Sequence, residues 1–110
     1  MKRSRFYFCL VPFALCLGIA GANAQSYPVK PIRIIVPFPP GGIADLFARI
    51  IGQKFGEAWG QAGIVENRPG AGGNIGAELV AKSAPDGYTL VTGSIGTHAV
   101  NVSIFRKLPY

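Results

Sequence analysis

The sequence predicts an α/β protein built on a parallel three-stranded sheet, with its elements in the order β-α-β-α-β. Short apolar runs of strand length alternate with segments of helical periodicity, and a glycine-rich loop follows each predicted strand. Strands that alternate with helices over short connections form parallel sheets with right-handed crossovers. Such sheets bind ligands outside the carboxyl ends of their strands, so we expect all three loops to lie together at that edge.

The first strand and the first helix have the clearest patterns. The strand is expected at 32–38, a nearly continuous apolar run bounded by prolines, which is typical of a strand covered on both faces. The helix is expected at 44–59, because apolar residues recur there at three- and four-residue steps. This apolar stripe consists of Phe47, Ile50, Ile51, Phe55 and Trp59. Gly60 is placed to end the helix, and close approach to the sheet would explain Gly52 and Gly56.

The rest of the chain continues the alternation. The remaining strands and helices are expected at 64–68, 75–83, 88–92 and 98–105, the last being a weak helix. Asn74 stands where it can cap the second helix, because Asn is a favoured N-cap residue. The segment 84–87, Ala-Pro-Asp-Gly, has the residues of a tight turn and should return the chain to the third strand.

The loop before the first helix is the main functional clue. It has the sequence PFPPGG and enters the helix without Ser, Thr or Asn at the capping position. A helix start carries unsatisfied N–H groups and a partial positive charge, so an uncapped, glycine-lined start is suited to bind an anion. We expect Gly41 and Gly42 to present backbone N–H groups to that anion. For Asp45 we prefer a local cap, favoured by the helix dipole, over ligand contact.

The amino-terminal segment has the features of a secretory signal peptide. Three basic residues precede the apolar run 6–20, and Ala22 and Ala24 occupy the small-residue positions of a cleavage site. We therefore expect a signal peptide at 1–24, cleaved after Ala24. The apolar run is short for a membrane span, so the mature chain is expected to be soluble and exported rather than embedded in the membrane. Residues 25–110 are enough for one small core.

Composition disfavours several function classes. Cys9 and Cys16 both lie in the predicted signal peptide, which leaves the mature chain without a disulfide or a thiol nucleophile. The formal charge is +6, from 11 Lys and Arg against 5 Asp and Glu, but the cations are scattered and not interleaved with aromatic residues, so we expect no nucleic-acid partner. His98 is the only histidine, and neither metal binding nor acid–base catalysis has the partners it needs. We expect no catalytic residue, metal or cofactor.

Two segments imitate nucleotide-binding motifs without completing them. A G-x-G-x-x-G frame that begins at Gly70 has Ile75 at its third glycine position. The segment 76–83 approximates a phosphate-binding loop but has Ala81 where that motif requires glycine. An α/β nucleotide-binding enzyme domain is therefore the less favoured alternative.

Three longer motifs carry a specific resemblance. They are YPVKPIRIIVPFPPGGIAD, VENRPGAGGNIGAELVAKSAPDGYTL, and GSIGTHAVN ahead of KLPY. In this order and spacing the chain resembles the extracytoplasmic receptors of tripartite tricarboxylate transporters, the Bug or TctC family. The resemblance implies a type II periplasmic binding protein, in which two α/β lobes close over a small organic anion, commonly a carboxylate. It implies delivery of that anion to a membrane permease, a periplasmic location and no enzymatic activity.

The resemblance also implies a set of ligand-binding residues. They are Phe38, Pro40, Gly41, Gly42, Asp45, Gly73, Ser94, Thr97, His98 and Asn101. Phe38 would supply an apolar wall, and the segment 97–101 is similar to the family's cleft-lining segment. His98 is as readily explained by burial or a hydrogen bond at a helix start, and Asn101 is left open between ligand contact and a surface position.

The family's receptors are much longer than this chain. The resemblance therefore implies that residues 25–110 form a truncated half-lobe, a partial first lobe of the clamp. A non-functional truncated fragment is the alternative to a working binding module, because a single lobe supplies only part of the contacts to a ligand.

Overall fold

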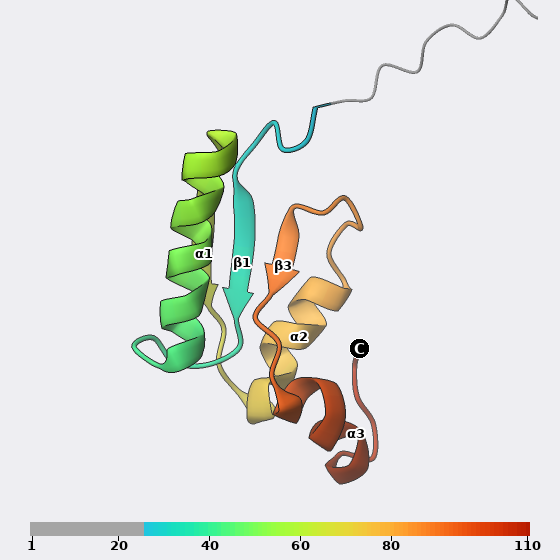
Figure 1. Ribbon diagram of the computed structural model, residues 1–110. Helices are drawn as coiled ribbons and strands as arrows, with labels where there is room; N and C mark the ends of the chain where they lie inside the picture. The colour runs from blue at the N-terminus through green and yellow to red at the C-terminus, as the bar shows by residue number, and fades with distance from the viewer. Residues whose placement is uncertain (1–25) are drawn as a thin grey trace, which may run out of the picture.

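The predicted order of strands and helices is confirmed. The computed structural model describes residues 26–110 (Figure 1), so the predicted signal peptide at 1–24 lies outside the described residues. The elements are β1 (Ile32–Val36), α1 (Ile43–Trp59), β2 (Gly63–Asn67), η2 (Ala71–Gly73), α2 (Asn74–Ala81), β3 (Thr89–Val91), η3 (Gly96–Val100) and α3 (Asn101–Ile104). Here η2 is a single 3₁₀ turn and η3 is a short π-helical segment that leads directly into α3. No helix in the part of the chain that the structure describes is long and apolar enough to cross a membrane.

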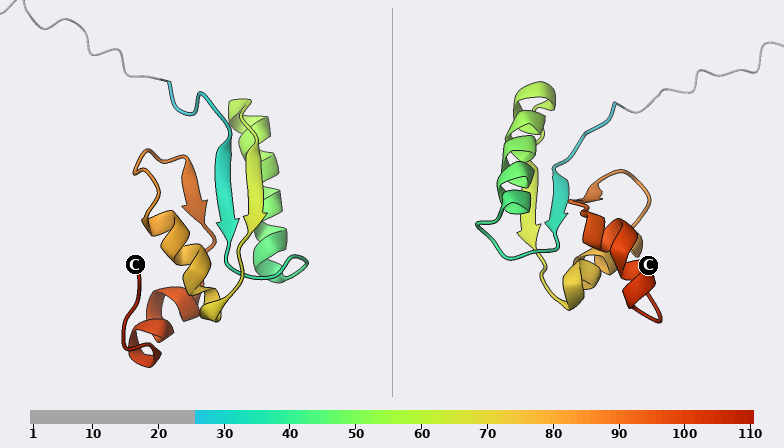
Figure 2. Two further views of the ribbon diagram at one scale, coloured as in Figure 1. Left: turned by 180° about the vertical axis from the view of Figure 1, so that it is seen from behind. Right: turned by 60° about the horizontal axis from the view of Figure 1, so that its bottom comes forward.

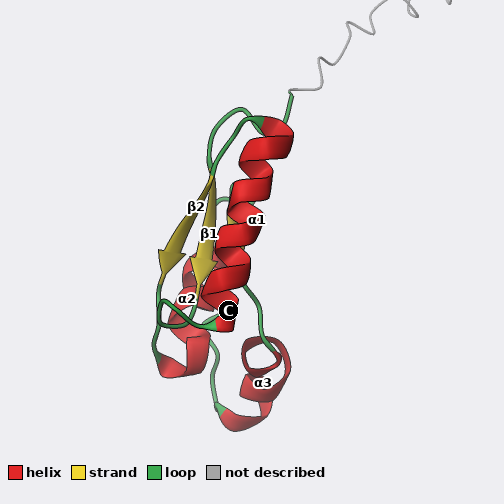
Figure 3. Cartoon of the chain, turned by 60° about the vertical axis from the view of Figure 1, so that its left-hand side comes forward, coloured by secondary structure: helices red, strands yellow, loops and turns green. Residues whose placement is uncertain are grey.

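The sheet is parallel, with strand order β2-β1-β3. Ile34 of the central strand lies opposite Val65 on one side and Leu90 on the other. α1 packs against β1 and β2, whereas α2 packs against β1 and β3 on the opposite face (Figures 2 and 3). The crossover β1-α1-β2 and the crossover β2-α2-β3 run in opposite directions across the sheet, so right-handed connections place their helices on opposite faces. The fold is therefore a three-layer α/β/α unit.

The core is centred on β1, as the apolar run predicts. Ile32, Ile35 and Val36 are fully buried, and Ile34 and Val36 pack with Ala48 of α1. Partly buried residues complete this cluster, namely Phe38, Ala44, Phe55 and Val65. The strand ends at Val36 rather than at the predicted residue 38. Pro37 has no N–H to extend the hydrogen-bonded ladder, which accounts for the earlier end.

The contact between α1 and the sheet is made by small residues. Ala48 and Gly52 are buried, and a Cβ atom on Gly52 would lie 2.8 Å from the carbonyl oxygen of Gly63. The predicted reason for Gly52 is confirmed, but for Gly56 it is wrong, since no atom lies within 4 Å of a Cβ built there. Gly60 ends the helix in the left-handed conformation, as predicted.

The predicted apolar stripe of α1 is not the face that packs on the sheet. Four of its five residues remain 45–57% exposed, namely Phe47, Ile50, Ile51 and Trp59. Only Phe55 is partly buried against the core. Hydrophobic periodicity located the helix correctly. The side that packs on the strands, however, is the one with the small residues Ala48 and Gly52.

Candidate functional site

All three glycine-rich loops lie at the carboxyl edge of the sheet. The arrowheads of β1 and β3 point toward the loops and toward the helix starts (Figures 1 and 2). Because the strand order is β2-β1-β3, β2 lies on one side of β1 and β3 on the other, so the direction of the chain across the sheet reverses at β1. This topological switch point is where open α/β sheets bind ligands. The expected convergence of the loops is confirmed.

The start of α1 has no side-chain cap. Its N-cap is Gly42, and no side chain bonds to the amides of the first turn. Among residues 26–110, no acceptor is found for the N–H groups of Gly42, Ile43 and Ala44, whereas the amide of Leu46 already donates to the carbonyl of Gly42. Gly42 and Ile43 are exposed. The positive end of a 17-residue helix therefore presents unpaired donors at the carboxyl edge.

Asp45 is a buried acceptor within the protein and not an open ligand contact. It is 4% exposed, and its Oδ2 accepts from the Gly41 N–H at 3.0 Å and from Arg49 Nε at 3.0 Å. Its Oδ1 accepts from Arg49 at 3.1 Å and from Asn67 Nδ2 at 3.0 Å. These donors, Arg49 first, lower the pKa of Asp45 to about 2. The structure thus favours the local, cap-like role.

The same contact changes the expectation for Gly41. Its amide is not free, because the Asp45 carboxylate accepts its hydrogen, so the prediction of an available N–H at this position is wrong. Gly41 instead provides backbone shape, with a φ of 89° that non-glycine residues rarely adopt. Gly42 has a φ of −82°, and the nearest atom to a Cβ built on it is the Pro39 carbonyl oxygen at 3.9 Å. Gly42 therefore has room for a side chain.

Phe38 and Pro40 flank the helix start. Phe38 is half-buried and packs on the core cluster, and its carbonyl accepts from Asn67 Nδ2 at 3.1 Å. Pro40 is exposed next to the two glycines. Phe38 therefore gives the loop an apolar border toward the core, and Pro40 adds exposed apolar surface beside the glycines.

Gly73 brings the three loops into contact. It is buried with a φ of 91°, and a Cβ there would lie 2.6 Å from Thr97 Cγ2, 3.5 Å from Pro37 Cβ and 3.6 Å from Phe38 Cζ. A side chain at this position has no space. Gly73 therefore lies beneath the surface of the edge, where it permits packing between loops rather than open ligand contact.

The third loop uses its hydroxyl groups internally. Thr97 is 1% exposed, and its Oγ1 accepts from the Ser94 N–H at 3.0 Å and lies 2.7 Å from His98 Nδ1. Ser94 Oγ in turn accepts from the Thr97 N–H at 3.2 Å. His98 is exposed. The hydroxyls of Ser94 and Thr97 thus fix the loop that starts the third helical segment.

Asn101 belongs to a buried network and not to the surface. Its Nδ2 donates to Asn74 Oδ1 at 2.6 Å and to the Gly72 carbonyl at 3.2 Å. Asn74 Oδ1 also accepts from the Tyr110 hydroxyl at 3.0 Å. The prediction that Asn74 caps α2 is wrong, because its side chain turns toward the third loop. Both asparagines tie the second loop to the third.

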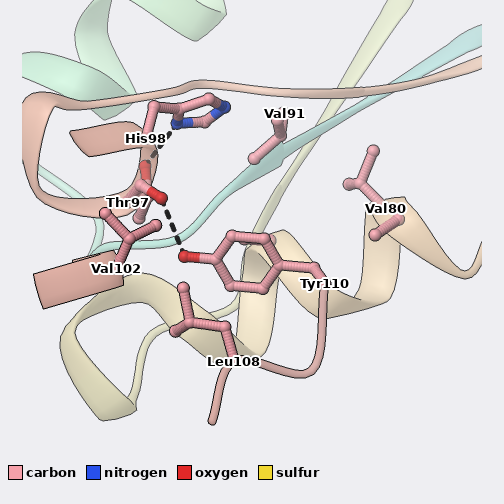
Figure 4. Close-up of a pocket in the computed structure, with 9 residues that line it drawn as sticks. Val80, Val91, Thr97, His98, Val102, Leu108 and Tyr110 are labelled. Atoms are coloured by element: carbon pink, nitrogen blue, oxygen red, sulfur yellow. Dashed lines mark hydrogen bonds between the residues drawn. The ribbon is translucent and has the colours of Figure 1, made fainter. Parts of the chain in front are cut away.

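A cavity of about 370 Å³ lies among α2, β3, the third helical segment and the last residues of the chain (Figure 4). It is lined by Ala77, Val80, Ala81, Val91, Thr97, His98, Val102, Leu108 and Tyr110. The Tyr110 ring extends into this space, and its hydroxyl donates to the Thr97 carbonyl at 2.8 Å. Thr97 and His98 line the cavity, but Phe38, Pro40 and Gly42 do not. The predicted site residues therefore separate into a set at the α1 start and a set around the third loop.

Metal-ligating side chains do not cluster in the region from 26 to 110. No group of three or more His, Cys, Asp or Glu residues there could hold a metal ion.

The residue that sequence reasoning missed at the α1 start is Asn67. It is the last residue of β2 and lies opposite Val36, so its side chain reaches both the loop after β1 and Asp45. The available signal was topological: adjacent parallel strands end side by side, so a polar residue at the end of β2 belongs near the loop that follows β1.

A family model, sequence relatives and solved structures all indicate the same protein family. The model of the tripartite tricarboxylate transporter family receptor matches residues 47–110. Protein BugT of Bordetella pertussis is 43% identical over the whole of this chain and 34% of its own length. The chain thus spans about a third of the length of the curated relatives that it matches.

Solved structures agree with the sequence relatives. Rpa4515 of Rhodopseudomonas palustris, determined with adipate, is 40% identical with a TM-score of 0.74, over 77% of this chain and 28% of the other. MatC from the same organism, with bound malate, is 44% identical with a TM-score of 0.72, over 76% and 29% of the two chains.

Proposed function

The chain belongs to the tripartite tricarboxylate transporter receptor family, and on this premise we propose that it is part of a periplasmic receptor that binds a small carboxylate. The family is one of receptors, in line with the non-enzymatic function expected from the sequence. Two solved relatives were determined with adipate and with malate, both dicarboxylates, and this supports the choice of ligand class.

The observation that carries this proposal is the uncapped start of α1. The amides of Gly42, Ile43 and Ala44 are the unpaired donors there, and they lie at the switch point of the sheet. A carboxylate that accepts two of these hydrogens also gains from the positive end of the helix dipole. The role of Asp45 is compatible with an anion nearby, because Arg49 neutralises it.

The other predicted residues have supporting roles in this proposal. Phe38 and Pro40 border the ligand with apolar surface. Gly41 shapes the turn, while Gly73, Ser94, Thr97 and Asn101 hold the second and third loops beside it. His98 is exposed and offers a side chain to a ligand that extends toward the third loop.

The proposal extends to the wider setting of the chain. Residues 1–24 act as a signal peptide cleaved after Ala24, residues 25–110 contribute to the first lobe, and a membrane permease receives the ligand. Backbone donors recognise the carboxylate group itself and do not distinguish the molecules that carry it.

Replacing Gly42 by valine tests the proposal. The position has room for a Cβ and a φ that valine accepts, so the fold is kept while the side chain covers the amides. We expect carboxylate affinity to fall by about tenfold or more, which corresponds to losing one or two hydrogen bonds. Calorimetry with dicarboxylates, amino acids and aromatic acids measures the change, and Gly56→Ala is the matched control on the same helix. Unchanged affinity in Gly42→Val would exclude this loop from the site.

A further inference from the structure

We propose that Asn67 is a positioning residue for the carboxylate site, because its side-chain amide joins β2 to both the loop after β1 and the first turn of α1. This inference rests on the proposed function, since the loop that Asn67 holds is the one that presents the unpaired amides. Asn67 itself does not contact the ligand in this scheme.

Both hydrogens of the Asn67 amide are used in this connection. Nδ2 donates to the Phe38 carbonyl at 3.1 Å and to Asp45 Oδ1 at 3.0 Å. An amide group has two donor hydrogens, so neither is left for another partner. Asn67 is half-buried at the end of β2, where the sheet fixes its backbone. The side chain therefore links β2, the loop after β1 and the first turn of α1 by hydrogen bonds.

Besides the packing of Phe38 on the core, few hydrogen bonds hold this loop. Its three prolines provide no N–H, and of its two glycines Gly41 donates only to Asp45. Asp45 is in turn positioned by Arg49 and Asn67. Removing the Asn67 amide leaves a half-buried carbonyl at Phe38 without this donor and Asp45 with one donor fewer, which costs more than an exposed hydrogen bond would. The loop, and with it the amides of Gly42 and Ile43, is then free to shift.

Asn67→Asp converts this role into a pH-dependent one. The introduced carboxylate keeps the shape but donates no hydrogen and lies beside Asp45. The charged groups around the position are Asp45 and Arg49 of α1, Glu66 and Arg68 next to it in the chain, and Arg33 of β1, which pairs with Glu66. When two carboxyl groups are adjacent, the pKa of one of them is raised. At acidic pH that group therefore takes up a proton, and the proton again provides one hydrogen-bond donor between the two groups.

The experiment measures malate and adipate affinity of the full chain by calorimetry between about pH 5 and pH 8. Each variant is compared with the unmodified chain at the same pH, which cancels the titration of the ligand. We expect Asn67→Asp to bind about tenfold more weakly near pH 8 and to recover to within about threefold near pH 5. Asn67→Ala should be weak at both pH values. Gln53→Glu adds the same charge to an exposed position of α1 and should bind like the unmodified chain.

A second measurement is independent of any ligand. Hydrogen exchange at the Gly41 amide should be faster in Asn67→Ala than in the unmodified chain, while the amides of β1 keep their protection. Unchanged exchange at Gly41, or equal affinities for the unmodified chain and both Asn67 variants, would overturn the role of Asn67. If the unmodified chain does not bind carboxylates but exchange is faster in Asn67→Ala, the proposed function is overturned, while the role of Asn67 in holding the loop is retained.

Discussion

At Asp45, a single carboxylate is surrounded by donors from three places: its own helix, the preceding loop and the end of β2. The arrangement resembles a capping box, in which an acidic residue in the first turn accepts from the backbone before the helix. It explains why an acidic residue lies next to a proposed anion site. The carboxylate orders the loop, and Arg49 compensates its charge.

Acid titration of stability tests this role. The folded pKa of Asp45, about 2, lies below its ordinary value of 3.8, so its stabilisation is complete above the ordinary value and is lost as the pH falls toward 2. We expect urea-unfolding free energies of the chain to decrease across this window and to decrease less in Asp45→Asn. Glu66, whose pKa is also lowered, mainly by Arg33, leaves the variant some acid sensitivity. Identical slopes for the two proteins would contradict the account.

At the scale of elements, the two glycines of α1 differ in what they face. A Cβ on Gly52 would lie 2.8 Å from a backbone oxygen of β2, whereas one on Gly56 meets nothing within 4 Å. Gly56→Ala should therefore stabilise the chain by about 1 kcal/mol through helix propensity. Gly52→Ala should destabilise it by about 1–3 kcal/mol, because the helix must move off the sheet. Urea denaturation of the pair measures both changes, and a shift in the same direction for both would refute the packing described.

Prediction from sequence succeeded where the signal was local. The bounds of α1 differ from the prediction by one residue, because periodicity and Gly60 both mark the helix. It failed where a partner lies far along the chain: the acceptors of Asn67 are 22 and 29 residues away, and Asn74 pairs with Asn101 across 27 residues. The uncapped helix start was predictable, but the occupation of the Gly41 amide was not, since it depends on the side-chain geometry of Asp45.

At the scale of the whole molecule, the described residues expose much apolar surface. On α1 the exposed large residues are Ile43, Leu46, Phe47, Ile50, Ile51 and Trp59. Contiguous apolar patches on a protein surface are typical of interfaces or of association. The helix whose start is the proposed anion site thus also carries exposed apolar residues along its length.

This surface predicts self-association of the isolated chain. We expect its sedimentation coefficient to rise with concentration, and the double substitution Phe47→Gln with Ile50→Gln to reduce that rise because it interrupts the patch on one side of α1. Circular dichroism checks that the helix is retained. A concentration-independent sedimentation coefficient for the unmodified chain would show that the face does not associate.

The most direct test of the central claim is to follow the backbone amides of the ¹⁵N-labelled chain by NMR during titration with malate and adipate. The account predicts saturable shifts that are largest at Gly42, Ile43 and Ala44, with the amides of Gly56 and Gly60 at the far end of α1 unaffected. Shifts that are largest around His98 and Val102, or no saturable shift at the start of α1, would contradict it.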